Sequence, residues 1–224
     1  QWYIGESTIT KVIVPEGIEK IGSYAFANLT GLEEIVLPST LEAIEYGAFY
    51  GCTSLKLVEG LGSVKFINRN AFANCALEGS VKLDSVVALA DYAFFGNAPL
   101  KSVTLSAATQ SVGAYAFSGC SSLTSVQIPA EKIKLGRYAF SGCKALPAVS
   151  INASVVPAGA FDGCEALSSV TLGKDVAVIG LPDARLGEIA TAIIEIKEGM
   201  TCTEEEINEF SKGLPRYKRP RKII

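Results

Sequence analysis

Apolar positions recur along this chain with a period of about 23 residues. The clearest unit is an Ala-Phe pair, with an aliphatic residue five positions before the Phe and usually a Cys three positions after it. A period this regular predicts stacked coils, in which each coil contacts only its neighbours. The Phe residues are Phe26, Phe49, Phe72, Phe94, Phe117, Phe140 and Phe161, at spacings of 23, 23, 22, 23, 23 and 21 residues.

Two further apolar rows lie nine and eleven positions after each Phe, and only Gly60 breaks the second row. Because residues two apart point to the same face of a strand, these rows predict one short strand per coil. The aliphatic residue before the Phe predicts a second extended piece, and Ala-Phe itself predicts a tight bend or one helical turn. The two shortened periods are predicted to fall in the turns after Leu83 and Ile151.

The repeat resembles the BspA-like leucine-rich repeats over roughly residues 9–180. This resemblance implies a β-rich α/β fold, a right-handed leucine-rich-repeat solenoid of about seven 23-residue coils. It also implies a bacterial protein, secreted or at the cell surface, that binds other macromolecules. The motif is clearest in Leu123-x-x-Val126-x-Ile128-Pro129 followed by Gly136-x-Tyr138-Ala139-Phe140-x-Gly142-Cys143.

The repeat ends past Gly180, so residues 1–180 are predicted to form the solenoid and 181–224 a small α+β segment. That segment contains an extended run at 189–196 and a predicted helix over 204–212 that starts with a capping box. Residues 176–224 resemble part of the C-terminal subdomain of acyl-CoA synthetases and other adenylate-forming enzymes. The matching residues include Val178-Ile179-Gly180-Leu181-Pro182-Asp183, Lys197-x-Gly199 and Tyr217-Lys218-Arg219-Pro220-Arg221.

No catalytic residue is carried over from that resemblance. The large nucleotide-binding domain has no counterpart, and the chain stops before the Gly-Lys motif whose lysine serves adenylation. The junction around residues 172–180 fits both the repeat and the segment that resembles acyl-CoA synthetases. It fits the repeat because Ile179 lies seven residues after Leu172, as Ile44 lies seven after Leu37. The segment is therefore expected either to close the open end of the stack or to dock on an enzyme supplied in trans.

Composition narrows the function classes. Apolar residues make up 49% and charged residues 19% of the 224, which favours a large buried core. A net charge of −3 argues against nucleic-acid binding, and no apolar run is long enough for a transmembrane helix. The chain has no histidine, which excludes catalytic triads and metal sites that need one. We expect no enzyme activity, cofactor or metal.

Two rows within the repeat could carry chemistry or only packing. Cys52, Cys75, Cys120, Cys143 and Cys164 share one position, which Leu29 and Asn97 occupy in the other coils. We interpret this position as small, buried and apolar; a disulfide or metal role is the alternative. Tyr92, Tyr115 and Tyr138 form a candidate aromatic strip for a glycan or peptide, unless the rings only stack on one another.

The outward positions of the predicted strands form the candidate partner-binding face. Its partner would be a protein or a glycan, including host extracellular matrix; a merely solvated sheet is the alternative. The cytoplasmic accessory to acyl-adenylate chemistry stays open as a second hypothesis. The candidate row is Glu59, Lys82, Thr104, Gln127, Ser150 and Thr171.

Overall fold

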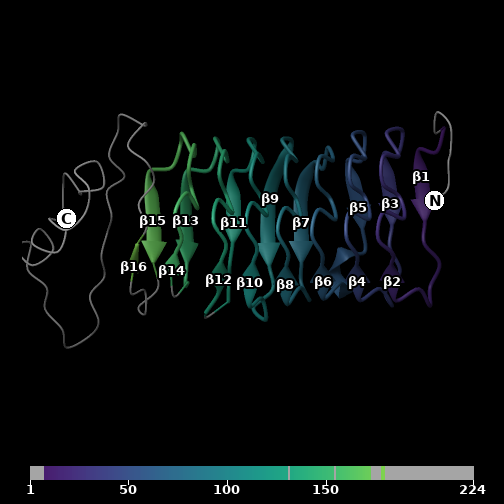
Figure 1. Cartoon of the computed structure of the whole chain (residues 1–224), viewed down its shortest axis with the longest axis horizontal. Helices are drawn as coiled ribbons and strands as arrows, with labels where there is room; N and C mark the ends of the chain where they lie inside the picture. The colour runs from purple at the N-terminus through teal and green to yellow at the C-terminus, as the bar shows by residue number, and fades with distance from the viewer. Residues whose placement is uncertain (1–7, 131, 154, 173–177, 180–224) are drawn as a thin grey trace, which may run out of the picture.

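The computed structural model describes residues 8–130, 132–153, 155–172 and 178–179. Over these residues the chain forms one row of stacked coils, each with a longer strand and a two-residue strand (Figure 1). The only helical element in the described ranges is the 3-10 turn η1 (Leu61–Ser63). The predicted solenoid and its period are confirmed; the extended run at 189–196 and the helix at 204–212 lie outside the described residues.

The longer strands pair in parallel along one side of the stack, with β1 beside β3 and β3 beside β5. This series consists of β1 (Lys11–Ile13), β3 (Glu34–Val36), β5 (Leu57–Glu59), β7 (Gly79–Leu83), β9 (Leu100–Leu105), β11 (Ser125–Gln127), β13 (Ala148–Ile151) and β15 (Ser169–Leu172).

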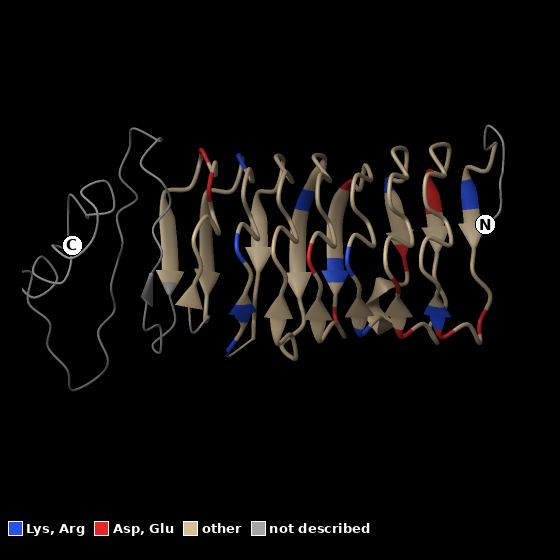
Figure 2. Cartoon of the chain, in the orientation of Figure 1, with Lys and Arg blue, Asp and Glu red and all other residues tan. Residues whose placement is uncertain are grey.

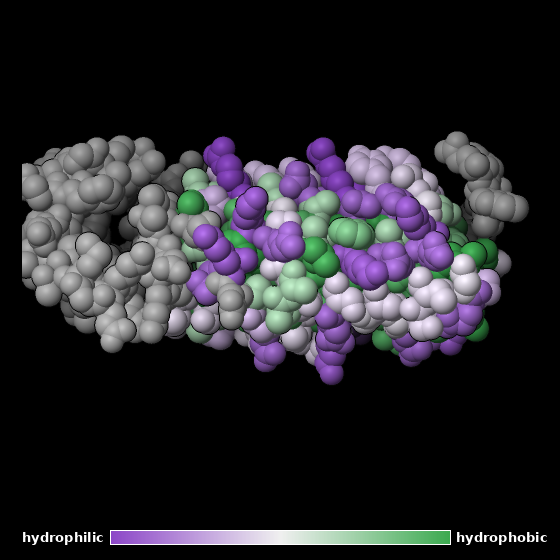
Figure 3. Space-filling view, turned by 90° about the horizontal axis from the view of Figure 1, so that it is seen from below, coloured by the Kyte–Doolittle hydropathy of each residue, from purple (hydrophilic) through white to green (hydrophobic). Residues whose placement is uncertain are grey.

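The two-residue strands form the second parallel series, which holds the aliphatic residue five positions before each Phe. Figure 3, which views the stack from below, shows hydrophilic and apolar residues intermixed over the described surface. The series consists of β2 (Lys20–Ile21), β4 (Ala43–Ile44), β6 (Phe66–Ile67), β8 (Ala88–Leu89), β10 (Ser111–Val112), β12 (Lys134–Leu135), β14 (Val155–Val156) and β16 (Val178–Ile179).

The Ala-Phe segment is a bend without a helix, and it bonds to the next coil. Phe94 donates its N–H to the Ala116 carbonyl at 2.8 Å, and Gly96 donates to Ser118 at 2.9 Å. The positions two before and two after each Phe have a positive φ, between 56° and 78°. Glycine and asparagine adopt this conformation readily, but tyrosine, which occupies the earlier position in four coils, does so rarely.

A continuous stack of Phe rings fills the centre of the coils. Neighbouring ring centroids are 5.0 to 5.7 Å apart, with interplanar angles of 4° to 13°. Phe49 to Phe140 are completely buried, whereas Phe26 at the first coil is only half-buried. Each ring therefore covers its two neighbours, so that one coil completes the core of the next.

Gly60 breaks the strand row for a steric reason. Its φ is +85°, and a Cβ there would lie 2.3 Å from the carbonyl oxygen of Leu37 in the preceding coil. Leu61, one residue later, is buried at 4% exposure and contributes to the core. The longer-strand sheet is interrupted here, because β5 and β7 belong to separate hydrogen-bonded sheets.

The shortened periods lie where the sequence predicted. Val81 pairs with Val103, 22 residues on, and Phe66 pairs with Ala88 at the same separation. Ala88 and Ser111, beyond the first shortening, are again 23 apart. The predicted continuation of the repeat as far as Ile179 is also confirmed, because Ile179 in β16 pairs with Val156 in β14 as the next repeat requires.

Replacing a central ring tests how far stability depends on this stack. We expect Phe94→Ala to lower the free energy of unfolding by about 3–5 kcal/mol, because it leaves a cavity with packed neighbours on both sides. Phe26→Ala should cost clearly less, since that ring is half-buried and has one stacking partner among the described residues. Urea denaturation measures both values, and equal losses would contradict a stack whose strength comes from neighbours on two sides.

Candidate functional site: an exposed strand face and a tyrosine row

The longer strands present the predicted candidate row on the outside of the stack. In β9, Val103 and Leu105 are buried while Thr104 between them is half-exposed, as strand alternation requires. Pairing in register places Thr104 between Lys82 and Gln127, and places Ser150 beside Thr171. The structure thus brings these five residues into two adjacent groups along one face. Their role in binding stays a prediction.

Glu59 begins this row on the other side of the sheet interruption. It pairs with Val36 of β3, and Gly60 follows it directly. Toward the N-terminus the same face also carries exposed apolar side chains, with Ile13 at 68% and Leu57 at 47% exposure. Ile13 was not among the residues predicted for this face, although its spacing of 23 residues from Val36 identifies its place in the row.

The polar part of the face is ordered by its own hydrogen bonds. Ser102 donates its hydroxyl to the Ser80 hydroxyl at 2.6 Å, in the outward row adjacent to the candidate row. An exposed ion pair joins Lys11 and Glu34 near the N-terminal end. Figure 2 shows charged residues of both signs spread along the described stack, without one face of a single sign. This face therefore suits hydrogen bonding more than capture of a highly charged polymer.

The tyrosine row forms a second ordered feature. Tyr92 and Tyr115 are stacked with centroids 4.9 Å apart, and Tyr115 and Tyr138 are stacked at the same distance. The row ends against Gly159, where a Cβ would lie 2.1 Å from the Tyr138 ring. The rings are half-buried, and their stacking holds side chains whose backbone has a positive φ. Whether the strip binds a ligand stays a prediction.

The cysteine row is buried, as expected, but it is not simply apolar. Each of these five thiols is free, and each donates to the Phe carbonyl of the preceding coil at 3.0 to 3.4 Å. Burial raises the pKa of the Cys120 thiol to about 12, so it stays protonated and able to donate. Cys202 lies outside the described residues.

Asn97 confirms that this position requires a donor. Its amide donates to the carbonyls of Phe72 and Phe94 at 2.8 and 2.9 Å, and its Oδ1 accepts from the Leu77 N–H at 3.1 Å. Leu29 occupies the position in the coil of Phe26, which is the first coil of the repeat, so the sequence holds no Ala-Phe pair one coil earlier whose carbonyl it would have to serve. Cys and Asn can both donate a hydrogen bond, and this shared property was the signal in the sequence that could have identified the position as a donor.

Comparison with known proteins identifies the repeat. The family model for the BspA-type leucine-rich repeat region matches residues 3–94 and 87–182. The chain belongs to the BspA-type leucine-rich-repeat family. The crystal structure of a leucine-rich repeat protein from Bacteroides ovatus is similar, with a TM-score of 0.66 and 26% identity, covering 83% of this chain. The match covers 51% of that protein, so this chain spans about half its length.

The C-terminal part of this leucine-rich-repeat chain is similar to a second protein family. The family model for the C-terminal domain of AMP-binding enzymes matches residues 165–224. A mitochondrial medium-chain acyl-CoA ligase of Danio rerio is 45% identical over 51 residues, 22% of this chain and 8% of the ligase. A 4-hydroxybutyrate–CoA ligase of Metallosphaera sedula is 54% identical over 39 residues, 17% of this chain and 7% of the ligase. The chain therefore spans less than a tenth of these relatives.

Asn97 allows a direct test of the donor requirement in the leucine-rich repeats. We expect Asn97→Leu to lower the free energy of unfolding by at least about 2 kcal/mol. The substitution leaves the Phe72 carbonyl and the Leu77 N–H buried without partners, at about 1–3 kcal/mol each, while the Phe94 carbonyl still accepts from Cys120. Asn97→Cys is the matched control: it retains a donor of the kind used in the other coils and should cost substantially less. Chemical denaturation would contradict the donor role if Leu were tolerated as well as Cys.

Proposed function

We propose that this chain is a non-enzymatic macromolecule-binding module that uses its exposed longer-strand face. The observation that carries the proposal is the alignment of Lys82, Thr104 and Gln127 at strand spacing on a continuous buried core. A partner that meets such a face finds its side chains already ordered, so little conformational entropy is lost on binding. Affinity then arises from many modest contacts along the stack.

The chemistry of the face favours a partner with many hydrogen-bonding groups. Its hydroxyl-rich part runs from Ser80 and Ser102 toward Thr171, while Ile13 and Leu57 provide an apolar end. A protein surface offers both polar and apolar contacts, so a protein partner, such as one of the host extracellular matrix, fits the whole face. A glycan would fit its hydroxyl-rich part. No helix among the described residues is long and apolar enough to cross a membrane.

The proposed location is the bacterial cell surface or the secreted fraction, on the basis of the family resemblance. The proposal includes no catalysis by this chain. Its support is that the described residues form a repeating scaffold, whereas the likeness to acyl-CoA ligases is confined to less than a tenth of those enzymes.

The second candidate function is accessory to acyl-CoA synthetase chemistry in the cytoplasm. The match of residues 165–224 to the C-terminal domain of AMP-binding enzymes favours it. In that case the segment would dock on a large enzyme domain supplied by another chain, and the solenoid would position the complex.

A double substitution tests the strand face. Thr104→Arg with Gln127→Arg introduces two bulky charges into neighbouring strands, and we expect at least a tenfold loss of binding to partners found on arrays of matrix proteins and glycans. Ala88→Arg with Ser111→Arg is the matched control, because it adds the same charge to paired two-residue strands of the second sheet. Unchanged binding by the first variant would refute the strand face as the binding surface.

Cellular location distinguishes the two candidate functions. We expect the native protein to be degraded by protease added to intact cells of its source bacterium, or to be found in the culture medium. An intracellular acyl-CoA synthetase and a known surface protein serve as controls. Protection from protease, together with co-purification of an acyl-CoA synthetase, would overturn the surface proposal and favour the accessory function.

A further inference from the structure

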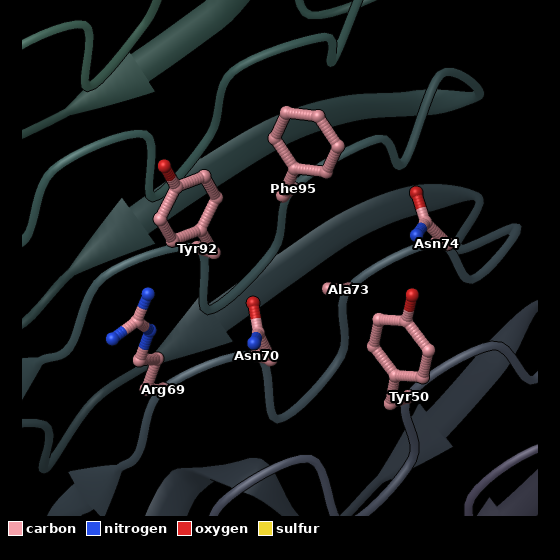
Figure 4. Close-up of a pocket in the computed structure, with 7 residues that line it drawn as sticks. All are labelled: Tyr50, Arg69, Asn70, Ala73, Asn74, Tyr92 and Phe95. Carbon is pink, nitrogen blue, oxygen red and sulfur yellow. The ribbon is translucent and has the colours of Figure 1, made fainter.

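The bend side of the stack contains a hollow of about 260 Å³ between three consecutive coils. Its rings are Tyr50, Tyr92 and Phe95, and its polar groups are Arg69, Asn70 and Asn74, with Ala73 between Tyr50 and Phe95 (Figure 4). The volume lies just below the range typical of sites for drug-sized ligands, so it suits a single ring. This surface is separate from the longer-strand face, whose strands pass behind these residues in Figure 4.

The hollow exists because two aromatic positions carry small residues in the same coil. Asn70 occupies the position that Tyr92, Tyr115 and Tyr138 occupy in the following coils, and it has the same positive φ. Ala73 occupies the position that Tyr50 and Phe95 hold in the coils on either side. The coil of Phe72 therefore lacks a ring that the following coil has in Tyr92, and a second ring that both adjacent coils have in Tyr50 and Phe95.

The missing rings leave aromatic surface available for a ligand. Tyr115 covers one face of Tyr92 in a parallel stack, so the other face is directed toward the coil of Asn70, where the Arg69 guanidinium lies 5.6 Å from the ring centroid. Phe95 meets Tyr92 edge-on, with an interplanar angle of 67° and centroids 5.6 Å apart. Two ring surfaces at a steep angle form a corner, against which the C–H face of a flat or chair-shaped ring can pack.

The polar groups around this corner add a positive charge and amides. The Arg69 guanidinium lies 5.6 Å from the Tyr92 ring centroid and is exposed. It forms no ion pair within the described residues, where the ion pairs involve three lysines. The side-chain amide of Asn74 has no hydrogen-bond partner in the described part of the chain, and that of Asn70 interacts with the Tyr46 hydroxyl.

Two carboxylates of the adjacent coils are engaged in hydrogen bonds elsewhere. Asp91, in the position equivalent to Arg69 one coil later, accepts a hydrogen bond from the Ala114 N–H at 2.8 Å. Glu45 accepts from the Asn68 amide at 2.8 Å. Arg69 therefore remains available to an anionic ligand, and its charge opposes a cationic one.

We propose that this hollow binds a sugar ring that bears a carboxylate, that is, a hexuronic acid unit of a polysaccharide. The aromatic corner packs against the C–H face of the pyranose. Arg69 pairs with the carboxylate, and the Asn70 and Asn74 amides bond to ring hydroxyls. Neutral sugars lack a partner for Arg69, and this difference provides the selectivity.

Ligand-detected NMR of the whole chain tests the proposal with two probes, methyl β-glucuronide and methyl β-glucoside, which differ only at C6. We expect saturation transfer to the glucuronide and at least a fivefold weaker effect for the glucoside. Equal transfer to both probes would overturn the role of the carboxylate. No transfer to either probe at millimolar concentrations would overturn the site.

Three variants locate the binding. Arg69→Gln should weaken glucuronide binding at least fivefold, whereas Arg137→Gln, which removes an arginine stacked on Tyr138, should have no effect. Asn70→Tyr should abolish binding by filling the gap with a ring that stacks on Tyr92, in a backbone conformation that tyrosine already adopts in this fold. The thermal unfolding temperature of Asn70→Tyr should not fall. Loss of binding without a lower unfolding temperature shows that the ring fills the hollow and that the protein still folds.

Retained binding in Asn70→Tyr, or equal effects of the two arginine variants, would overturn the assignment of the hollow. The strand-face variant Thr104→Arg with Gln127→Arg should leave glucuronide binding unchanged. This control separates the sugar site from the proposed strand-face function, since either can fail while the other holds.

Discussion

The bend of each coil depends on its neighbours for both its hydrogen bonds and its ring contacts. The Phe carbonyl turns toward the following coil, where a buried Cys or Asn donates to it. The Phe N–H donates in turn to the Ala carbonyl of that same following coil. Since an unpaired buried carbonyl or N–H costs about 1–3 kcal/mol, a coil cannot form this bend alone. The regular period therefore reflects repeated mutual satisfaction of polar groups as much as burial of apolar surface.

This dependence explains which features the sequence could predict. The Phe row, the strand rows and the shortened turns follow from apolar spacing, because every coil must bury the same face against its neighbours. The donor role of the Cys position was missed, since Cys is common in cores for apolar reasons. Only Asn97, a polar residue in that row, distinguished a donor from a small hydrophobe. The helical turn predicted as an alternative at Ala-Phe was wrong, because the residues two before and two after each Phe have a positive φ, which produces a bend.

The two surfaces differ in how far sequence reasoning could reach. Side chains alternate between the two faces of a strand, so Thr104 and Gln127 could be placed on the outward face from the sequence alone. The hollow depends on absences, namely Asn70 where the following coils have tyrosine and Ala73 where both adjacent coils have rings. Each absence is unremarkable in its own row. Their coincidence in one coil becomes meaningful only when the rows are placed next to each other in space.

The end of the repeat shows how one strand can belong to two patterns. The Val178–Ile179 strand pairs in register with Val155–Val156, and the family matches for the two parts of the chain overlap over residues 165–182. A terminal coil exposes unpaired strand edges and one face of its core, which favours any following segment that begins with an apolar strand. A segment related to acyl-CoA ligases that begins with such a strand can thus continue the sheet of the solenoid for one step. The physical requirement at the junction is the strand itself, and it places no demand on the chemistry of the residues that follow.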